Sequence, residues 1–224
     1  MFRNSKFEIV NIVIIGPAGS GKGTQAEKLA KKFDLVHVDM GKTLRQVAKQ
    51  DTQLGKRIRE IIYVKKELVP MDIAKQVLHL NLGSIPREQG LVLDGVPRNE
   101  EQRQYIEEAL LEFGRKVDQV FFVGISEEKA IKRISRRVVC DKCKAGFILG
   151  RDIENLTDPC PLCEGKIIRR ADDTEEGVKK RFGVFRQETA PIIEEYRRRG
   201  LLFEIDGEKE IEEVFQEILK KLEK

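Results

Sequence analysis

Short apolar runs alternate along the chain with segments whose apolar residues recur at helical spacing. Residues 9–15 (IVNIVII) are almost all β-branched, which is typical of a strand buried on both faces of a parallel sheet. In residues 22–33 (KGTQAEKLAKKF), Ala26, Leu29 and Phe33 fall on one helical face. The pattern therefore predicts a strand, a glycine-rich loop and a helix, in that order.

The same alternation continues toward the C-terminal end. Further strands are predicted at 91–94 (LVLD), 120–125 (VFFVGI) and 201–205 (LLFEI). Helices are predicted at 99–112, from a Ser126 cap to about Arg137, at 174–199 and at 208–223. Strands that alternate with helices indicate an α/β doubly wound parallel sheet with helices on both faces.

Two stretches interrupt this pattern. Residues 40–82 are helical without an intervening strand, and residues 138–169 are turn-rich and hold all the cysteines. Both are predicted to be insertions at strand ends, where such sheets bind ligands. The chain is therefore divided into a core (1–39, 83–137 and 172–224), a helical insertion (40–82) and a four-cysteine segment (138–171).

Length and charge narrow the function classes. The 224 residues suffice for one well-packed domain with smaller insertions, and 42 Lys and Arg against 38 Asp and Glu leave a net charge of only +4. That charge does not argue for nucleic acid. The chain has no apolar run of the ~20 residues that span a bilayer and no signal-peptide cleavage pattern at its start, so we expect a cytoplasmic protein without a membrane partner.

The loop between the first strand and helix carries the first candidate chemistry. Residues 16–24 read GPAGSGKGT, hereafter the phosphate loop, and offer backbone N–H groups, a helix N-terminus and the Lys22 cation to a nucleotide phosphate. An ordinary glycine-rich turn is the simpler alternative. Gly23 stands where the common loop has a Ser or Thr that binds magnesium, so the sequence leaves open what holds that metal.

The cysteines form a second motif. Cys140, Cys143, Cys160 and Cys163 follow the pattern C-x2-C-x16-C-x2-C, which suits tetrahedral zinc, and four thiolates leave no open position for a substrate. We therefore expect a structural zinc, with free structural cysteines as the alternative. A zinc ribbon can also bind nucleic acid, but three basic and four acidic residues between Cys140 and Cys163 give no basic face.

Several motifs in fixed order carry a family resemblance. They are GPAGSGKGTQA, LR at 44–45, LVP at 68–70, DGVPR at 94–98 followed by Gln102, RISRRV at 133–138 and RRADDTEEGVKKR at 169–181. Together they resemble adenylate kinases over nearly the whole chain. The four-cysteine segment is similar to the long-lid, zinc-bearing form of that family, which makes residues 40–82 the insertion that binds the nucleoside monophosphate.

The resemblance implies a monomeric, magnesium-dependent phosphotransferase that interconverts ATP plus AMP with two ADP. Such transfer needs no protein nucleophile, so positioning and cationic stabilisation carry catalysis. The residues implied to be catalytic are Lys22, Asp94, Arg98, Arg133, Arg170 and Arg181. Those implied to bind ATP are Gly19, Ser20, Gly21, Lys22, Gly23, Thr24, Arg133, Arg137, Gly146, Phe147 and Lys209. Those implied to bind AMP are Met40, Arg45, Glu67, Leu68, Val69, Gly95, Val96, Pro97, Arg98, Gln102, Arg170 and Arg181.

Two acidic positions have specific roles in the resemblance. Asp94 supports magnesium through ordered waters, and a turn-forming Asp before a glycine is the simpler interpretation. Asp172 and Asp173 follow the lid and would pair with arginines when the lid closes. A helix cap at the start of the 174–199 helix would explain one of these two residues equally well.

The chain departs from the family pattern on the monophosphate side. The usual Ser-Thr-Gly-Asp reads Asp39-Met40-Gly41-Lys42, the usual Asp-Glu after LVP is Met71-Asp72, and the usual Phe is Val96. Because Lys42 replaces an acid, Asp94 is expected to carry the magnesium waters more alone. A kinase with another acceptor base, or a non-catalytic ATP-binding zinc-ribbon adaptor, therefore stays open, whereas Gln102 favours AMP because its amide can both donate to and accept from adenine.

Overall fold

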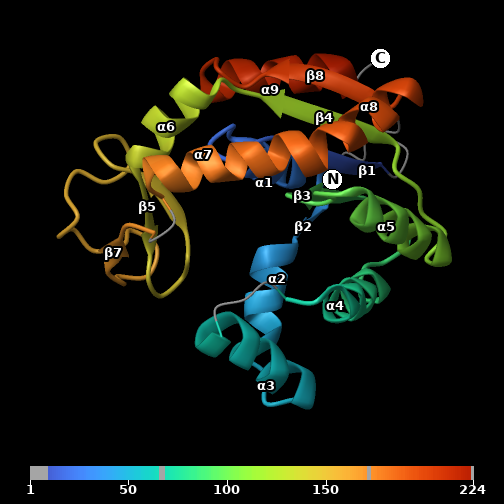
Figure 1. Cartoon of the computed structure of the whole chain (residues 1–224), viewed down its shortest axis with the longest axis horizontal. Helices are drawn as coiled ribbons and strands as arrows, with labels where there is room; N and C mark the ends of the chain where they lie inside the picture. The colour runs from blue at the N-terminus through green and yellow to red at the C-terminus, as the bar shows by residue number, and fades with distance from the viewer. Residues whose placement is uncertain (1–9, 66–68, 171–172, 223–224) are drawn as a thin grey trace, which may run out of the picture.

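The computed structural model of the chain describes residues 10–65, 69–170 and 173–222. Its centre is a five-stranded parallel sheet in the order β2-β3-β1-β4-β8 (Figure 1). The strands of this sheet are β1 (Asn11–Ile15), β2 (Val36–Asp39), β3 (Leu91–Asp94), β4 (Gln119–Gly124) and β8 (Leu202–Asp206). The predicted doubly wound parallel architecture is confirmed.

Alternating strand residues build one core on each face of the sheet. Ile12 and Ile14 of β1 pack into one hydrophobic cluster, and Val13 and Ile15 pack into the other. All four side chains are at most 3% exposed. The β-branched run at the start of the chain is thus apolar on both sides because helices cover both sides.

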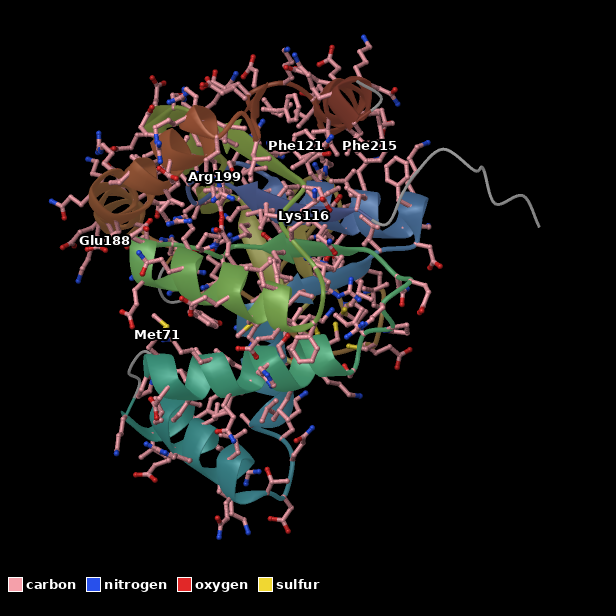
Figure 2. The ribbon with its side chains drawn as sticks, turned by 90° about the vertical axis from the view of Figure 1, so that its right-hand side faces the viewer. Met71, Lys116, Phe121, Glu188, Arg199 and Phe215 are labelled. Carbon is pink, nitrogen blue, oxygen red and sulfur yellow. The ribbon has the colours of Figure 1, made fainter. Side chains whose placement is uncertain are left out.

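Helices cover the two faces in separate groups. They are α1 (Lys22–Phe33), α5 (Glu100–Glu112), α6 (Glu127–Ser135), α7 (Glu175–Val184), the π-helical η2 (Phe185–Thr189), α8 (Ala190–Arg198) and α9 (Ile211–Leu222). Helices α1 and α9 pack on the face that holds Phe121 of β4, where Phe215 of α9 joins the same cluster (both labelled in Figure 2), whereas α5 and α8 cover the opposite face.

The two insertions project from this core. The first consists of α2 (Met40–Val47), α3 (Gln53–Arg59), the π-helical η1 (Glu60–Lys65) and α4 (Met71–Gly83). The second is a small antiparallel sheet in the order β6-β5-β7, made of β5 (Arg137–Cys140), β6 (Gly146–Ile148) and β7 (Ile167–Ile168). Figure 1 shows the two as separate projections, the helices at the bottom and the small sheet at the left.

Some predicted boundaries differ from the structure. The helix predicted to reach Arg137 ends at Ser135, and Arg137 opens β5. The 174–199 helix is interrupted by η2, and α9 begins at Ile211 rather than at 208. The segment predicted as turn-rich holds the three lid strands, which are only two to four residues long. Within the described ranges, every helix is too short or too polar to cross a lipid bilayer.

Candidate functional site

The phosphate loop presents uncapped donors at the start of α1. Gly19 and Gly21 adopt positive φ angles of 82° and 88°, which side chains disfavour. Gly21 is the N-cap, and in the described part of the chain no side chain caps this helix, so the first-turn N–H groups of residues 22–24 are left to bind an anion. The buried hydroxyl of Ser20 also has no partner among the described residues. The loop therefore fits a bound phosphate.

Lys22 and Asp94 face each other across this loop. The Lys22 ammonium donates to the Pro17 carbonyl at 3.3 Å. Burial lowers the pKa of Lys22, and the charge of Asp94 partly offsets this effect. A methyl group added at Gly23 would lie 3.1 Å from the Asp94 carboxylate. The carboxylate thus occupies the space beside the position where the common loop has its hydroxyl.

Two residues near Asp94 were missed by sequence reasoning. Asp39 ends β2 and is the register partner of Asp94 on β3, and its charge also acts on Lys22. Its carboxylate caps α2 by accepting from the Lys42 N–H at 2.9 Å. His37 of β2 places Nε2 3.3 Å from the Asp94 carboxylate. A second carboxylate, that of Asp39, thus lies next to Asp94 and three residues before position 42, where Lys42 stands in place of the family's acid.

Arg98 is held by contacts from three directions. Its N–H donates to the Gln102 side-chain oxygen at 2.8 Å, and its Nε donates to the Gly95 carbonyl at 2.8 Å. Its own carbonyl accepts from the Thr189 hydroxyl at 2.7 Å. Within the ranges that the structure describes, its two terminal nitrogens have no hydrogen-bond partner. They lie over Gly95, where an added methyl would be 3.6 Å from Nη2 and 4.0 Å from the Lys22 Cε.

The other residues predicted to bind the monophosphate differ in burial and position. Met40 and Val96 are 6% and 9% exposed, and both belong to the core cluster together with the partly buried Val69. Val96 and Pro97 are joined by a cis peptide bond. A methyl added at Gly41 would lie 3.2 Å from the Arg45 guanidinium, which places Arg45 on the same side as Asp39. The predicted residues Glu67 and Leu68 lie outside the described residues.

Two residues predicted on the ATP side, Arg133 and Lys209, meet at the loop that follows β8. Arg133 of α6 donates to three successive carbonyls of that loop, those of Gly207 (2.6 Å), Glu208 (3.2 Å) and Lys209 (3.3 Å). The ammonium of Lys209 pairs with Glu217 at 2.7 Å. In this conformation Arg133 anchors the loop.

Asp173 joins Arg137 and Arg181, two arginines that flank the four-cysteine segment. It accepts from Arg137 Nε at 2.7 Å and Nη2 at 2.5 Å, and from Arg181 Nη2 at 3.1 Å. Its side chain is only 2% exposed. Arg170 is exposed beside this cluster. The N-cap of α7 is Thr174, so the alternative interpretation of Asp173 as a helix cap is wrong, and Asp172 lies outside the described residues.

The four cysteines converge, although the two pairs, Cys140 with Cys143 and Cys160 with Cys163, are separated by 16 residues. Their sulfur atoms all lie within 4.8 Å of one another, with Cys140 to Cys163 at 3.5 Å and Cys143 to Cys160 at 3.7 Å. Zinc bonds of ~2.3 Å in a tetrahedron place sulfurs about 3.8 Å apart, so the set fits this ion. Burial opposes ionisation of Cys140, but N–H groups of Cys143 and Lys142 lower its pKa to about 6.

Glycine is required next to the cysteine cluster. A methyl group added at Gly165 would lie 2.7 Å from the Cys140 sulfur. The predicted ATP-contact residues are near: Gly146 opens β6 in open space, and Phe147 packs partly on the lid core. The sequence signal that could have pointed to this contact is the glycine two residues after Cys163, which was not considered.

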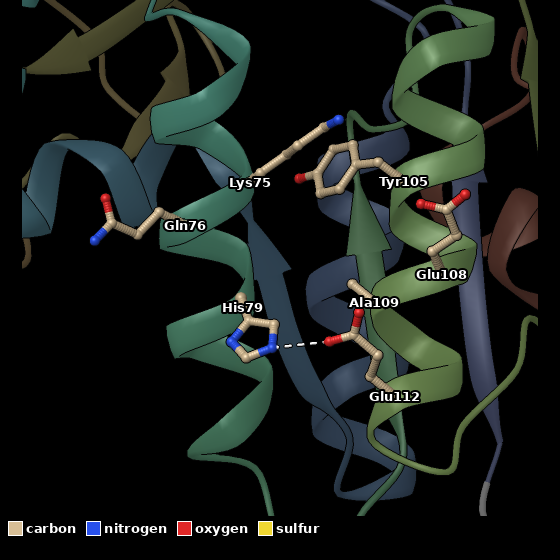
Figure 3. Close-up of a pocket in the computed structure, with 7 residues that line it drawn as sticks. All are labelled: Lys75, Gln76, His79, Tyr105, Glu108, Ala109 and Glu112. Carbon is tan, nitrogen blue, oxygen red and sulfur yellow. Dashed lines mark hydrogen bonds and ion pairs between the residues drawn. The ribbon is translucent and has the colours of Figure 1, made fainter.

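A separate groove lies between α4 and α5 (Figure 3). Its volume is about 270 Å³, and none of the predicted site residues lines it. Its lining includes His79, which contacts Glu112 at 3.0 Å, and Lys75, whose ammonium lies 5.4 Å from the Tyr105 ring centre. The groove therefore joins the helical insertion to the core without sharing residues with the phosphate loop.

Comparisons with known proteins agree with one another. A family model described as adenylate kinase matches residues 14–201. A protein named adenylate kinase from Archaeoglobus fulgidus is 37% identical over 215 residues, covering 96% of this chain and 99% of its own. Proteins of the same name from Caldicellulosiruptor saccharolyticus and Methanosarcina barkeri are also 37% identical, over 95% and 96% of this chain.

Proposed function

This chain belongs to the adenylate kinase family, and on that premise we propose how its own residues carry the transfer of a phosphoryl group between ATP and AMP. The observation that carries the proposal is the grouping of Lys22, Asp94 and the Arg98 guanidinium around Gly23 and Gly95 at the carboxyl ends of β1 and β3. Two cations and one acid at a phosphate loop match the needs of a phosphoryl transition state.

We assign the donor side to the phosphate loop and the lid. The N–H groups of residues 22–24 and the Ser20 hydroxyl bind the ATP phosphates, and Lys22 follows the transferred group. Arg137 and Arg181 exchange Asp173 for phosphate oxygens as the lid closes, together with Arg170. Arg133, Gly146, Phe147 and Lys209 complete the ATP side, and closure excludes water from the reaction.

We assign the acceptor side to Arg98 and Arg45, with the buried side chains of Met40 and Val96 beneath them. Arg98 offers two free-facing nitrogens to the AMP phosphate, a bidentate geometry suited to that group. The Gln102 oxygen already accepts from Arg98, so its amide group is left to donate. Adenine N1 can accept from this amide, so the arrangement is compatible with AMP as the acceptor, although the Gln102 oxygen that the sequence assigned to adenine is bonded to Arg98 instead.

The proposal includes two metals, magnesium and zinc, which would be held by different residues. Magnesium neutralises phosphate charge when it is bound with the nucleotide, and its preference for oxygen ligands and waters fits Asp94 and Asp39 beside the phosphate loop. Zinc fits the four cysteines and leaves no position for substrate, so we propose a structural role. We further propose that residues 40–82 and 138–171 move as separate units on a core that acts as a cytoplasmic monomer, without nucleic-acid or membrane partners.

The test is a coupled assay with ATP and magnesium over AMP, GMP, UMP and CMP. We expect AMP to be the best acceptor. Lys22→Met should reduce kcat by roughly 100-fold or more, the size that removal of one transition-state donor produces. The matched control is Lys179→Met, which removes an exposed lysine that only pairs with Glu175.

Three results would contradict the proposal. A better acceptor than AMP would contradict the acceptor assignment. Phosphoryl transfer that is absent from the unchanged protein would indicate a non-catalytic nucleotide-binding role. Equal activity of the Lys22→Met and Lys179→Met variants would contradict the role of Lys22.

A further inference from the structure

Thr189 uses its hydroxyl outside its own helix. It is the last residue of η2 and directly precedes α8, and it is 5% exposed. A threonine within a helix ordinarily bonds its own backbone one turn earlier or caps a helix start. No cap bond is formed by its side chain in the described structure, and the hydroxyl instead donates to the Arg98 carbonyl at 2.7 Å, 91 residues away.

The segment that carries Thr189 is fixed to the sheet at a second point. The rings of Phe185 in η2 and Phe122 in β4 stack with centres 6.1 Å apart and planes 17° apart. The π-helical turn lies between these two anchors. Such turns are frequent at functional sites because the wider turn redirects side chains. Here η2 docks on β4 through Phe185 and on the loop that follows β3 through Thr189.

This contact completes the restraint of Arg98. Its backbone N–H, its carbonyl and its Nε are each in a hydrogen bond, to Gln102, Thr189 and Gly95. Only the Thr189 contact comes from a distant part of the chain. Without it, Arg98 would be held only by residues within four positions of it in the sequence, and its carbonyl would have no hydrogen-bond partner among the described residues. The Thr189 hydroxyl therefore holds the backbone from which the Arg98 side chain extends.

We propose that Thr189 is a positioning residue for AMP binding, because its hydroxyl fixes the Arg98 carbonyl and thereby aims the Arg98 guanidinium at the acceptor phosphate. The inference rests on the acceptor role of Arg98 proposed above. It has a second consequence, since α7, η2 and α8 form one arm that also carries Arg181. The arginines assigned to the acceptor phosphate and to the transferred group are thus set from one helical body.

The experiment measures KM for AMP and for ATP separately in the intact protein. Thr189→Val keeps the shape but removes the donor, and should raise KM for AMP about 5-fold, as loss of one hydrogen bond does, while KM for ATP changes by less than about twofold. Thr189→Ser keeps the hydroxyl and should restore KM for AMP. Thr189→Ala provides the same measurement if the valine variant does not fold.

A stability control separates positioning from simple destabilisation. Ile192→Val removes one carbon from a fully buried residue of α8, which costs stability but leaves the hydroxyl in place. We expect it to lower the melting temperature without changing KM for AMP. Equal KM shifts in Ile192→Val and Thr189→Val, an unchanged KM in both Thr189→Val and Thr189→Ala, or failure of Thr189→Ser to restore KM would each overturn the inference.

Arg98→Met distinguishes this inference from the function on which it rests. It should raise KM for AMP by at least tenfold more than Thr189→Val does. If Arg98→Met leaves KM for AMP unchanged, the acceptor role of Arg98 is wrong and the inference fails with it. If Arg98→Met acts as expected and the Thr189 variants do not, only the inference is wrong.

Discussion

The loop of residues 94–98, here the acceptor loop, and the residues that flank the four-cysteine segment hold their arginines in different ways. Arg98 of the acceptor loop is held through its backbone and its Nε, and within the described residues its two terminal nitrogens form no hydrogen bond. Arg137 and Arg181, which flank residues 138–171, share the carboxylate of Asp173. In the roles proposed above, a phosphate meets Arg98 directly but must replace a carboxylate to meet the other two.

This difference matches the two tasks. A fixed guanidinium is ready before the acceptor arrives and loses little conformational freedom on binding. Ion pairs that a ligand can replace suit a segment that must move, because each state then offers the arginines a partner. The four-cysteine segment also has a set of converging sulfurs that could hold a metal ion, whereas the acceptor loop depends on elements of the sheet core.

Removal of the metal from the four-cysteine segment should have the largest effect and should separate the two regions most clearly. Structural zinc contributes several kcal/mol to folding, and a protein of this size loses about 2–4 °C of melting temperature per kcal/mol. We therefore expect chelation of the zinc-loaded protein to lower the melting temperature by about 10 °C or more. KM for AMP should change far less, because no hydrogen bond or ion pair of the described residues joins the acceptor loop to the cysteine cluster. A melting temperature that does not move after complete metal loss would refute the structural role.

Asp94→Asn tests the core side. The substitution removes a charged oxygen beside Lys22 and Gly23 while it keeps the shape. We expect turnover to fall by roughly 10- to 100-fold and the magnesium requirement to rise, with little change in nucleotide binding by calorimetry. Asp51→Asn, at an 88% exposed carboxylate, is the control. Equal turnover in the two variants would rule out this role of Asp94.

Asp173→Asn tests the ion pairs that Asp173 forms with Arg137 and Arg181. It removes the negative charge that Arg137 and Arg181 share, and the two guanidiniums then face each other without it. Because both are more than a quarter exposed, solvent screens part of the effect, and we expect a loss of about 1–2 kcal/mol, or about 3–6 °C. Thermal unfolding at low and high salt measures it. A difference that does not shrink at high salt would argue against an electrostatic cause.

His79→Gln should have the smallest effect. Its contact with Glu112 joins α4 to α5, but both side chains are more than half exposed. An exposed contact of this kind contributes at most about 1 kcal/mol, so we expect the melting temperature to fall by no more than about 2–4 °C. Thermal unfolding of the two proteins side by side checks this. A clearly larger loss would show that the contact between α4 and α5 contributes more than an exposed pair does.

Local patterns predicted the parts of the site that lie within one stretch of sequence. The phosphate loop, the strand that ends at Asp94 and the cysteine pairs all have signals within a few residues, and the structure places them as the fold requires. The lid strands were not predicted because two to four residues are too few to show a period. The N-cap of α7 was missed because Asp172, Asp173 and Thr174 are adjacent and are all good caps.

Contacts between distant segments could not be predicted from sequence. The bond from Thr189 to Arg98 spans 91 residues and leaves no local pattern. The same holds for Asp39, whose position looked like a loss of the usual residue but lies in register with Asp94. Substitutions that appear unfavourable one at a time can thus be balanced across neighbouring strands.

The close approach of Gly23 to Asp94 has a consequence for how this chain can be altered. The 3.1 Å between the carboxylate and an added methyl means that the two positions share one small volume. A side chain at 23 and a change at 94 should therefore show strong coupling in a double-mutant cycle, with effects that do not add. The order in which the two substitutions are made then matters. A serine introduced at 23 while the aspartate is present meets a crowded, charged neighbour, whereas the same serine introduced after 94 has been shortened has room to bind the metal itself.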